Sequence, residues 1–549
     1  MKSLYLLLGI ALFLLIYRLD SLSYLESSEA RYAEISREML VSDDYVTPTL
    51  IDIKHFHKPP LTYWMTAISF KLFGINNFSG RIFPTLCGLG ILIFTFLIAR
   101  MLFPGMPQIH LWSVGILLSS LLFLVQARVV TTDIYLSFLT ISAIYFQWKR
   151  KFYYGSEKLI IPAAIFLALA FLTKGPIPFI FFIFPYFVFI FLFPKMKNVN
   201  LSESIKFLII FIIIVTPWFW LIIRDNPKLL EYFMVNQTVD RYASTVHHRS
   251  GSPFYYIGVL LVGMLSWFMF YFPSLFMTLK RWKTRHEHPW EYLLIVYTFI
   301  PLVFFSFSGS KLPAYIMPAL PFFSILLAYW IFGKYQNHGF KSIHILNSLQ
   351  CLLIPLLLII RPFKNVPSQI GHYDLLFWFL LCLPLGYFII FRYSLKNIKI
   401  RFEWVYGIYN VTLFLVLLTV LPSVQDDLNS FEGMAKVINN NLKEGEQLVS
   451  YKVRLPSLYF YTGQRVIHLM HDREIQFEDQ KSMATLETYL SNDPDKLADF
   501  LLSDAGYYVT IRRKDWLKYL INREKLATAV DTLYENQKYL LLKNQRLKM

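Results

Sequence analysis

Histidine and lysine residues gather in two stretches whose spacing could bind an anion or a metal. The stretch KHFHKPPLTYW, residues 54–64, places His55, His57 and Lys58 directly before two prolines. Proline restricts its own backbone and that of the preceding residue, so these side chains are expected on an extended turn. The stretch HHR, residues 247–249, carries a second histidine pair. Histidines from separate loops, with a carboxylate or water, could complete a divalent metal site, and the neighbouring lysine and arginine suit phosphate.

Single polar residues stand at the ends of three apolar runs. Asp133 in TTDIYLS begins one run, and Lys174 in LTKGP ends another. Lys311 and Tyr315 in SGSKLPAYIMP open a third, where Pro313 predicts a helix start. Charges at span ends are costly and typically functional, so we expect these residues to converge on one site. The alternatives are that Asp133 only caps its helix and that each lysine extends to the membrane surface.

The segment ESSEARYAEISREML, residues 26–40, combines much charge with helix signals. Ser27 or Ser28 could cap a helix, and Glu29 would lie in its first turn, where an acidic side chain favours the helix dipole. Apolar residues between the charges predict an amphipathic helix at the membrane interface. The simpler alternative is that its arginines only contact lipid headgroups.

The composition is that of a protein with many membrane spans. Of 549 residues, 56% are hydrophobic and 16% are charged, whereas a soluble domain has about 25% charged residues. Apolar runs of about 20 residues predict transmembrane helices. Thirteen such runs are found: 3–20, 80–103, 108–126, 132–149, 159–173, 175–194, 207–224, 254–279, 291–308, 313–333, 344–361, 373–391 and 403–422.

Charge alternates between the loops. The short loops near 149–158, 195–206, 280–285 and 392–401 are basic, which predicts that they are cytoplasmic. The same rule explains the formal net charge of +17 without nucleic acid, which we do not expect as a partner. The N-terminus is then cytoplasmic, and the loops 21–79 and 225–253 and the C-terminal region face outward.

The region from 423 onward has the sequence pattern of a soluble domain. QLVSYK, RVIHLM, YYVTI and YLLLK predict strands, and SMATLETYL, DKLADFLL and DWLKYLI predict helices with polar faces. We therefore expect a transmembrane domain over residues 1–422 and an outward α/β domain over residues 423–549.

Several blocks together resemble a known family. EARYAEISREML, KPPLTYW, FKLFGINNFSGR, LTKG, VHHR followed by PFYY, and FFSFSGSKLPAYIMP are similar to the bacterial aminoarabinose lipid A transferases. These belong to a superfamily of GT-C glycosyltransferases that also includes protein O-mannosyltransferases. The matching blocks run from about residue 20 to 320.

The resemblance implies a thirteen-helix inner-membrane domain with a periplasmic α/β domain. The implied reaction moves a sugar, with inversion, from an undecaprenyl phosphate donor to a phosphate of lipid A at the periplasmic face. Motif by motif, it places Arg31, Lys58, Arg249 and Tyr315 around the lipid phosphate. Lys174 and Lys311 are further candidates for this role from their position alone.

Asp133 matches an acidic residue that the family needs for activity. His248 matches a zinc ligand, and His57 stands where the family has the other ligand, a glutamate. Zinc is therefore a candidate cofactor. Glu29 matches the glutamate of the first-loop motif, but Ser28 stands where the family has a catalytic aspartate.

Serine cannot act as a base at neutral pH, which constrains the mechanism. An acceptor hydroxyl needs a base nearby, whereas an acceptor phosphate is already ionised and needs only positioning. We therefore expect an anionic acceptor, with Asp133 and Glu29 orienting the sugar or the acceptor.

Other functions stay open at this point. A transferase could use another polyprenyl-phosphate sugar and glycosylate a protein or another glycolipid, and the change at Ser28 could mark an inactive relative. A flippase for lipid-linked sugars would also have many spans, but it predicts mid-membrane functional residues and often repeats, neither of which we find. A binding or assembly protein would not explain Lys58 and Arg249 beside span ends.

Overall fold

The computed structural model forms two compact units. The first comprises residues 1–19, 58–62 and 81–420, and the second comprises residues 20–57, 63–80 and 421–549. The structure describes residues 2–26, 28–153, 155–197, 200–235, 251–334, 402–425, 430–469, 490–491, 493, 495–521, 523 and 526–545.

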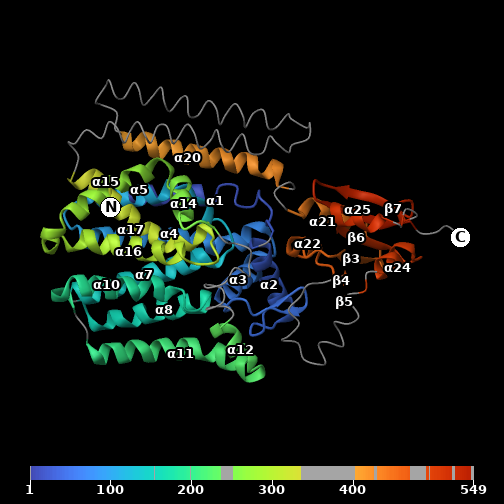
Figure 1. Ribbon diagram of the computed structural model, residues 1–549, viewed down its shortest axis with the longest axis horizontal. Helices are drawn as coiled ribbons and strands as arrows, with labels where there is room; N and C mark the ends of the chain where they lie inside the picture. Colours follow the sequence, from blue (N-terminus) through green and yellow to red (C-terminus); the bar gives the residue numbers. More distant parts are fainter. Residues whose placement is uncertain are drawn as a thin grey trace. The chain divides into compact units, whose positions relative to one another are not determined.

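The first unit consists of helices (Figure 1). Its α-helices are α1 (Lys2–Ile16), α4 (Asn77–Leu102, from residue 81 on), α5 (Pro107–Leu118), α6 (Leu121–Gln126), α7 (Thr132–Phe152), α8 (Ile160–Lys174), α9 (Pro178–Phe182), α10 (Phe184–Leu192), α11 (Leu201–Asp225), α12 (Lys228–Glu231), α14 (Tyr255–Gly263), α15 (Tyr271–Lys280), α16 (Pro289–Ser306), α17 (Leu320–Ala328) and α20 (Phe402–Val420). Short 3-10 or π segments are η1 (Glu157–Leu159), η2 (Pro194–Met196), η4 (Leu265–Phe270), η5 (Trp282–Glu287), η6 (Pro313–Ala319) and η7 (Tyr329–Lys334).

Several of these helices could cross a membrane. Within the described residues, four segments are long and apolar enough: Asn77–Leu102, Leu201–Asp225, Pro289–Ser306 and Pro313–Gly333. The predicted run 254–279 corresponds to Tyr255–Gly263 and Leu265–Lys280, a pair that is bent by 114° and that would be a fifth span if both helices cross together. The predicted runs 344–361 and 373–391 lie outside the described residues.

The run 108–126, predicted as one span, is two helices. Ser119 lies between α5 and α6, and Ser120 has an extended backbone. The Ser120 side chain accepts a hydrogen bond from the Phe123 backbone and so caps α6. The serine pair therefore ends one helix and starts the next, because hydroxyl side chains compete with the helical backbone bonds.

Helices α7, α8 and α11 lie side by side in this order (Figure 1). Leu136 on α7 and Ala170 on α8 are buried together, with Leu61 of the chain before α4 packed on them. Gly175 has a positive φ of 64° and donates to the Phe171 carbonyl, so it ends α8 directly after Lys174. This arrangement sets the ends of α7 and α8 beside each other.

Two buried arginines hold the C-terminal end of α1. Arg128 donates to the carbonyls of Leu14 and Leu15 at 2.9 and 2.8 Å and to that of Arg18 at 3.1 Å. Arg81 donates to the Leu19 carbonyl at 3.1 Å. The last carbonyls of a helix have no partner within it, so these guanidinium groups satisfy them.

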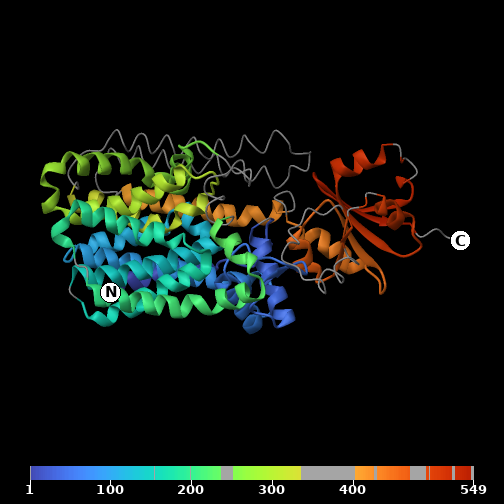
Figure 2. The ribbon, with the colours of Figure 1, turned by 60° about the horizontal axis from the view of Figure 1, so that its bottom comes forward.

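The second unit contains a six-stranded sheet with the strand order β5-β4-β3-β6-β8-β7. The first four pair in parallel, and β8 pairs antiparallel with β6 and β7. Figure 2 shows helices packed on this sheet. The elements are η9 (Leu421–Val424), α21 (Glu432–Asn441), β3 (Gln447–Tyr451), α22 (Pro456–Thr462), β4 (Val466–Leu469), β5 (Leu490–Ser491), α24 (Lys496–Leu502), β6 (Tyr507–Arg512), α25 (Arg513–Leu520), β7 (Val530–Glu535) and β8 (Tyr539–Asn544).

Side-chain alternation explains how helices cover the sheet. Val449 and Val509 pack with Leu501 of α24 and Trp516 of α25 on one face. On the other face, Tyr508 donates to a backbone carbonyl at the end of α21 at 2.7 Å. The predicted α/β character and the four predicted strands are confirmed. The predicted helix SMATLETYL lies outside the described residues, and the other two predicted helices are α24 and α25.

Residues 20–57 and 63–80 of the second unit also form helices and strands. It contains α2 (Glu29–Ser42), the antiparallel pair β1 (Thr49–Leu50) and β2 (Ile53–Lys54), and α3 (Leu61–Phe73, from residue 63 on). The turn between the two strands places both Ile51 and Asp52 at positive φ, of 59° and 60°. A β-branched residue rarely adopts this conformation, so the turn is strained unless its surroundings hold it.

Candidate active site

Asp133, Lys174 and Tyr315 lie together in the first unit. The Nζ atom of Lys174 is 2.5 Å from Oδ1 of Asp133, and it lies 4.3 Å from the centre of the Tyr315 ring. The three residues are 6%, 9% and 7% exposed. The structure therefore brings together three of the residues predicted to form the site, and it removes their charges from bulk water.

Asp133 does not cap its helix, so that alternative is wrong. Helix α7 begins at Thr132, with Thr131 as the preceding residue, and Asp133 is in its first turn. An acidic side chain there interacts favourably with the helix dipole, while its carboxylate is free to point at the end of α8. Lys174 likewise turns inward to this carboxylate and does not extend away from the bundle.

Lys311 is held by a tight polar turn. Its Nζ donates to the Ser308 carbonyl at 2.6 Å, and the Ser308 hydroxyl donates to the Ser310 carbonyl at 3.0 Å. A side chain built on Gly251 would meet the Lys311 stem at 3.4 Å, so the chain after residue 250 passes directly over this lysine. The predicted helix start at Pro313 is confirmed, as a 3-10 segment that packs against α7.

Lys58 also belongs to the first unit and is half-buried. It precedes Leu61 by three residues, and Leu61 packs on the cluster of Leu136 and Ala170 from α7 and α8. Arg249 and His248 lie outside the described residues.

The other predicted site residues lie in the second unit. Ser28 directly precedes α2, but its backbone is already helical, with φ −90° and ψ −52°, and its side chain forms no capping hydrogen bond. The predicted Ser28 cap is therefore wrong, because a capping residue needs an extended backbone to aim its oxygen at the helix. Glu29 is 4% exposed in the first turn of α2, and Arg31 is half-buried.

Sequence reasoning missed Glu26 as a neighbour of Arg31. Its carboxylate accepts a hydrogen bond from the Ser457 backbone at 2.7 Å. Burial raises the pKa of Glu26 to about 7, although Ser457, Arg31 and Arg454 act in the opposite direction. The only signal in the sequence was an acidic residue five positions before Arg31; its partners from 431 residues away could not be read.

The acidic residues of α2 are buried, a feature that the prediction of an amphipathic helix at the membrane interface did not include. Glu34 is 1% exposed and binds Arg37 through two hydrogen bonds of 2.7 Å. Glu38 accepts hydrogen bonds from the Thr49 hydroxyl at 2.6 Å and from the backbone of Ile51 at 2.5 Å. Burial, reinforced by Glu34, raises the pKa of Glu38 to about 8. These partners explain the burial: the helix holds the strained turn.

His57, one of the two predicted zinc ligands, lies beside the ring of His55. The rings of His55 and His57 lie 3.8 Å apart, but within the described part of the chain no group of three or more histidine, cysteine or acidic side chains could hold a metal. The predicted partner His248 is not among those residues. Zinc binding by His57 and His248 stays a prediction.

Known proteins are similar to this chain in sequence and in fold. Residues 2–233 match the family described as dolichyl-phosphate-mannose-protein mannosyltransferase. An undecaprenyl phosphate-alpha-4-amino-4-deoxy-L-arabinose arabinosyl transferase of Yersinia enterocolitica is 31% identical over 333 residues, which cover 58% of this chain and 57% of the relative. A protein of the same name from Photorhabdus laumondii is 25% identical over 82% of this chain and 81% of its own.

The solved structures agree. The crystal structure of ArnT from Cupriavidus metallidurans bound to undecaprenyl phosphate superimposes with a TM-score of 0.81 at 20% identity, covering 99% of this chain and 98% of that one. The chain has the fold of that ArnT. The fold expected from the resemblance is therefore confirmed. An Archaeoglobus fulgidus oligosaccharyltransferase has a more distant likeness, with a TM-score of 0.51 at 11% identity.

The ArnT-like fold covers nearly the whole chain, whereas the sequence match to the Yersinia relative covers little more than half of either protein. The similarity in fold therefore extends to residues that the sequence match to the Yersinia relative does not cover.

Proposed function

We propose that this chain is an inverting glycosyltransferase of the bacterial inner membrane. It moves a sugar, 4-amino-4-deoxy-L-arabinose by the relatives' names, from undecaprenyl phosphate to a phosphate of lipid A. The transmembrane domain has thirteen spans in this proposal, and the α/β domain and the active site face the periplasm. The buried group of Asp133, Lys174 and Tyr315 is the observation that carries it.

The chemistry follows from where negative charge develops. As the sugar leaves, charge grows on the donor phosphate, and fixed cations and donors aimed at that charge lower the barrier. Lys174 has three N–H donors and uses one of them on Asp133, so it can also donate to a phosphate oxygen. Lys58, Arg31, Arg249, Lys311 and the Tyr315 hydroxyl would complete the set around the donor.

Asp133 has two roles in this proposal. Its carboxylate fixes the position of the Lys174 ammonium, and it orients the sugar or the acceptor together with Glu29. The acceptor phosphate is itself an anion and needs no general base, which fits the serine at position 28.

One observation favours a second candidate function. Residues 2–233 match a family of protein mannosyltransferases, whose acceptors by name are proteins. A protein hydroxyl requires a base, and Ser28 removes the carboxylate that the GT-C family has at that position. We therefore rank this function second.

The deciding experiment is mass spectrometry of lipid A from cells with and without the intact gene. The proposal predicts that the deletion strain loses a species heavier by one aminoarabinose and regains it on complementation. Unchanged lipid A together with a sugar lost from a membrane protein would instead support the second function.

A further inference from the structure

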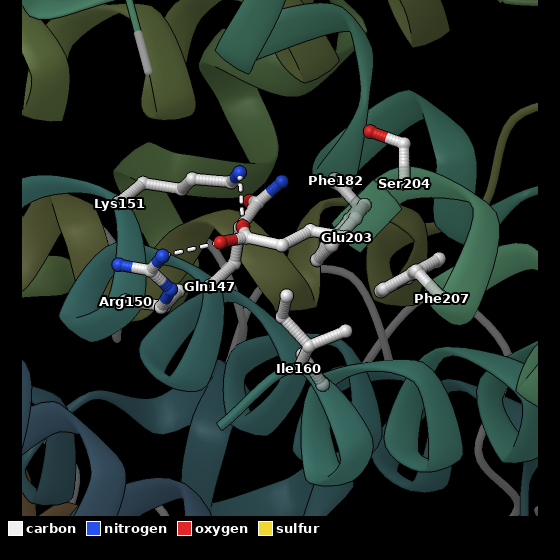
Figure 3. A pocket seen from close by; sticks show the side chains of 9 residues that line it. Gln147, Arg150, Lys151, Ile160, Phe182, Glu203, Ser204 and Phe207 are labelled. Atoms are coloured by element: carbon white, nitrogen blue, oxygen red, sulfur yellow. Dashed lines mark hydrogen bonds and ion pairs between the residues drawn. The ribbon is translucent and has the colours of Figure 1, made fainter. Parts of the chain in front are cut away.

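A small cavity lies in the first unit far along α7 from Asp133, at the end of the helix that carries basic residues. It has a volume of about 170 Å³ and is formed by α7, α8, α9 and α11 (Figure 3). Gln147, Arg150 and Lys151 line it from α7, and Glu203 faces them from α11. Its remaining wall is largely apolar. The cavity is thus charged at one end and hydrophobic at the other, and the proposed transferase reaction does not use it.

Basic side chains outnumber acidic ones in the lining of the cavity. Arg150 and Lys151 both contact the carboxylate of Glu203, Lys151 at 2.8 Å, as the dashed lines in Figure 3 show. Glu203 is buried, and the two basic side chains are only 14% and 13% exposed. Among the side chains that line the cavity, two are basic and one is acidic. A cavity lined by more cations than anions favours an anionic ligand.

One donor in the cavity is also unused. The Nε atom of Arg150 is buried and has no hydrogen-bond partner among the described residues. The Oε1 atom of Gln147 beside it is likewise buried and without one. A guanidinium group binds phosphate oxygens through two neighbouring N–H groups, so Arg150 can hold Glu203 and a phosphate together.

The wall of the cavity continues into a surface suited to lipid tails. Ile160, Phe182 and Phe207 line the cavity. Helix α11 is an apolar candidate span of which only 11% is buried, and Ile205 and Leu208 next to the cavity are exposed. A ligand with one phosphate and hydrocarbon chains therefore finds a matching charge inside and a matching surface outside.

We propose that this cavity binds the headgroup phosphate of an anionic phospholipid, with the acyl chains lying along α11. Basic pockets between helices on the side with basic loops bind anionic headgroups for the reasons given above. This membrane face is opposite to the one where we place the donor site. The bound lipid would fix the ends of α7, α8 and α11, the same three helices that position Asp133 and Lys174.

The test measures lipid retention by native mass spectrometry of the purified full-length protein in detergent. The probes are palmitoyl-oleoyl phosphatidylglycerol, the matching phosphatidylcholine, and inorganic phosphate. We expect the wild-type protein to retain phosphatidylglycerol in preference to phosphatidylcholine and not to retain inorganic phosphate, which has no acyl chains. Equal retention of the two phospholipids, or retention of inorganic phosphate, would overturn the proposal.

Three variants separate this site from general surface charge. Arg150→Gln should weaken phosphatidylglycerol binding about tenfold, the effect of losing one charge-assisted contact. Lys206→Gln is the matched control, because Lys206 lies on α11, as Glu203 does, but is 60% exposed and paired only loosely with Glu157, at 3.7 Å. It should leave binding within about twofold, as expected for an exposed pair.

Glu203→Gln guards against a trivial loss of folding. Removing the competing carboxylate leaves two positive charges in the cavity, so phosphatidylglycerol should bind more tightly than in the wild-type protein. A misfolded variant cannot give that gain. Two results would contradict the proposal: less lipid bound by Glu203→Gln, or binding weakened as much by Lys206→Gln as by Arg150→Gln. Arg150, Lys151 and Glu203 would then form only a structural ion-pair network.

Discussion

Lys174 and Asp133 are 41 residues apart in the chain, yet the ammonium of one lies 2.5 Å from the carboxylate of the other. The pair joins the end of α8 to the start of α7, and both side chains are less than a tenth exposed. A buried ion pair offsets the loss of hydration only if its geometry is good and further groups contact its charges. The ring of Tyr315, which lies beneath the ammonium, is one such group.

Asp133→Asn should reduce transferase activity at least about 100-fold, because Lys174 loses the carboxylate that positions it. It should also lower the free energy of unfolding by about 3 kcal/mol, since one partner of a buried pair is left alone. Activity is measured as sugar transfer, and stability as the thermal unfolding midpoint in detergent.

The double variant Asp133→Asn with Lys174→Met provides the internal check on the pair. Its loss of stability should be smaller than the sum of the two single losses, because the partners are removed together. Asp225→Asn, in an exposed pair with Arg224 at the end of α11, is the control and should change neither quantity much. Additive losses would mean that the two residues act independently.

Tyr315→Phe distinguishes the hydroxyl from the ring. The ring stays under Lys174, so stability should change by less than about 0.5 kcal/mol. If the hydroxyl contacts the donor phosphate, activity falls about tenfold with the loss of one hydrogen bond to a charged group. Tyr315→Ala should lose about 1 kcal/mol more through the cation–π contact. Full activity of Tyr315→Phe would show that the hydroxyl has no role and that only the ring of Tyr315 contributes.

Ser28→Asp tests the departure from the family motif. Aspartate at this position restores the carboxylate that the family has, at the start of a helix where negative charge is favourable. If a carboxylate at position 28 contributes to transfer, the rate should rise several-fold in Ser28→Asp. Ser28→Asn, of similar size but neutral, should not raise it. A loss of rate in Ser28→Asp alone would show that the serine suits an anionic acceptor, which the new charge repels.

The stability of the second unit should fall as the pH rises. Burial raises the pKa of Glu38 from an ordinary 4.5 to about 8, so the unfolded chain releases this proton first. Its contribution to stability is therefore full below about pH 4.5 and is lost as the pH rises through 8, at about 1.4 kcal/mol per unit of pKa shift.

Glu38→Gln isolates this effect. The amide mimics the protonated carboxyl, so the difference in unfolding midpoint between pH 5 and pH 8 should shrink in the variant. Glu26, with a pKa raised to about 7, adds a slope of the same sign that the variant keeps. An unchanged pH dependence in Glu38→Gln would show that Glu38 is ionised in the folded protein.

Much of the fold was predictable from local pattern. Apolar runs marked the helices, and period-two stretches marked the four strands β3, β4, β6 and β8. The edge strand β7 was missed because its sequence, VDTLYE, is largely exposed and carries no clear alternation. The break at Ser119 was missed because apolar residues continue on both sides of it.

The candidate site was predictable only as a set of residues. The charged positions at span ends identified Asp133, Lys174 and Tyr315, but their mutual contacts depend on how α7, α8 and η6 pack. The burial of Glu34 and Glu38 could not be read, since an acidic residue looks the same in the sequence whether water or a strained turn satisfies it.

The central claim is that this chain transfers a sugar to lipid A through the group around Asp133. The most direct measurement reconstitutes the purified protein with undecaprenyl-phosphate-linked aminoarabinose and lipid A and records the lipid A mass over time. The account predicts a gain of one aminoarabinose with the wild-type protein and almost none with Asp133→Asn, both assayed at a temperature at which the variant is still folded. No gain with the wild-type protein, or an equal gain with Asp133→Asn, would contradict it.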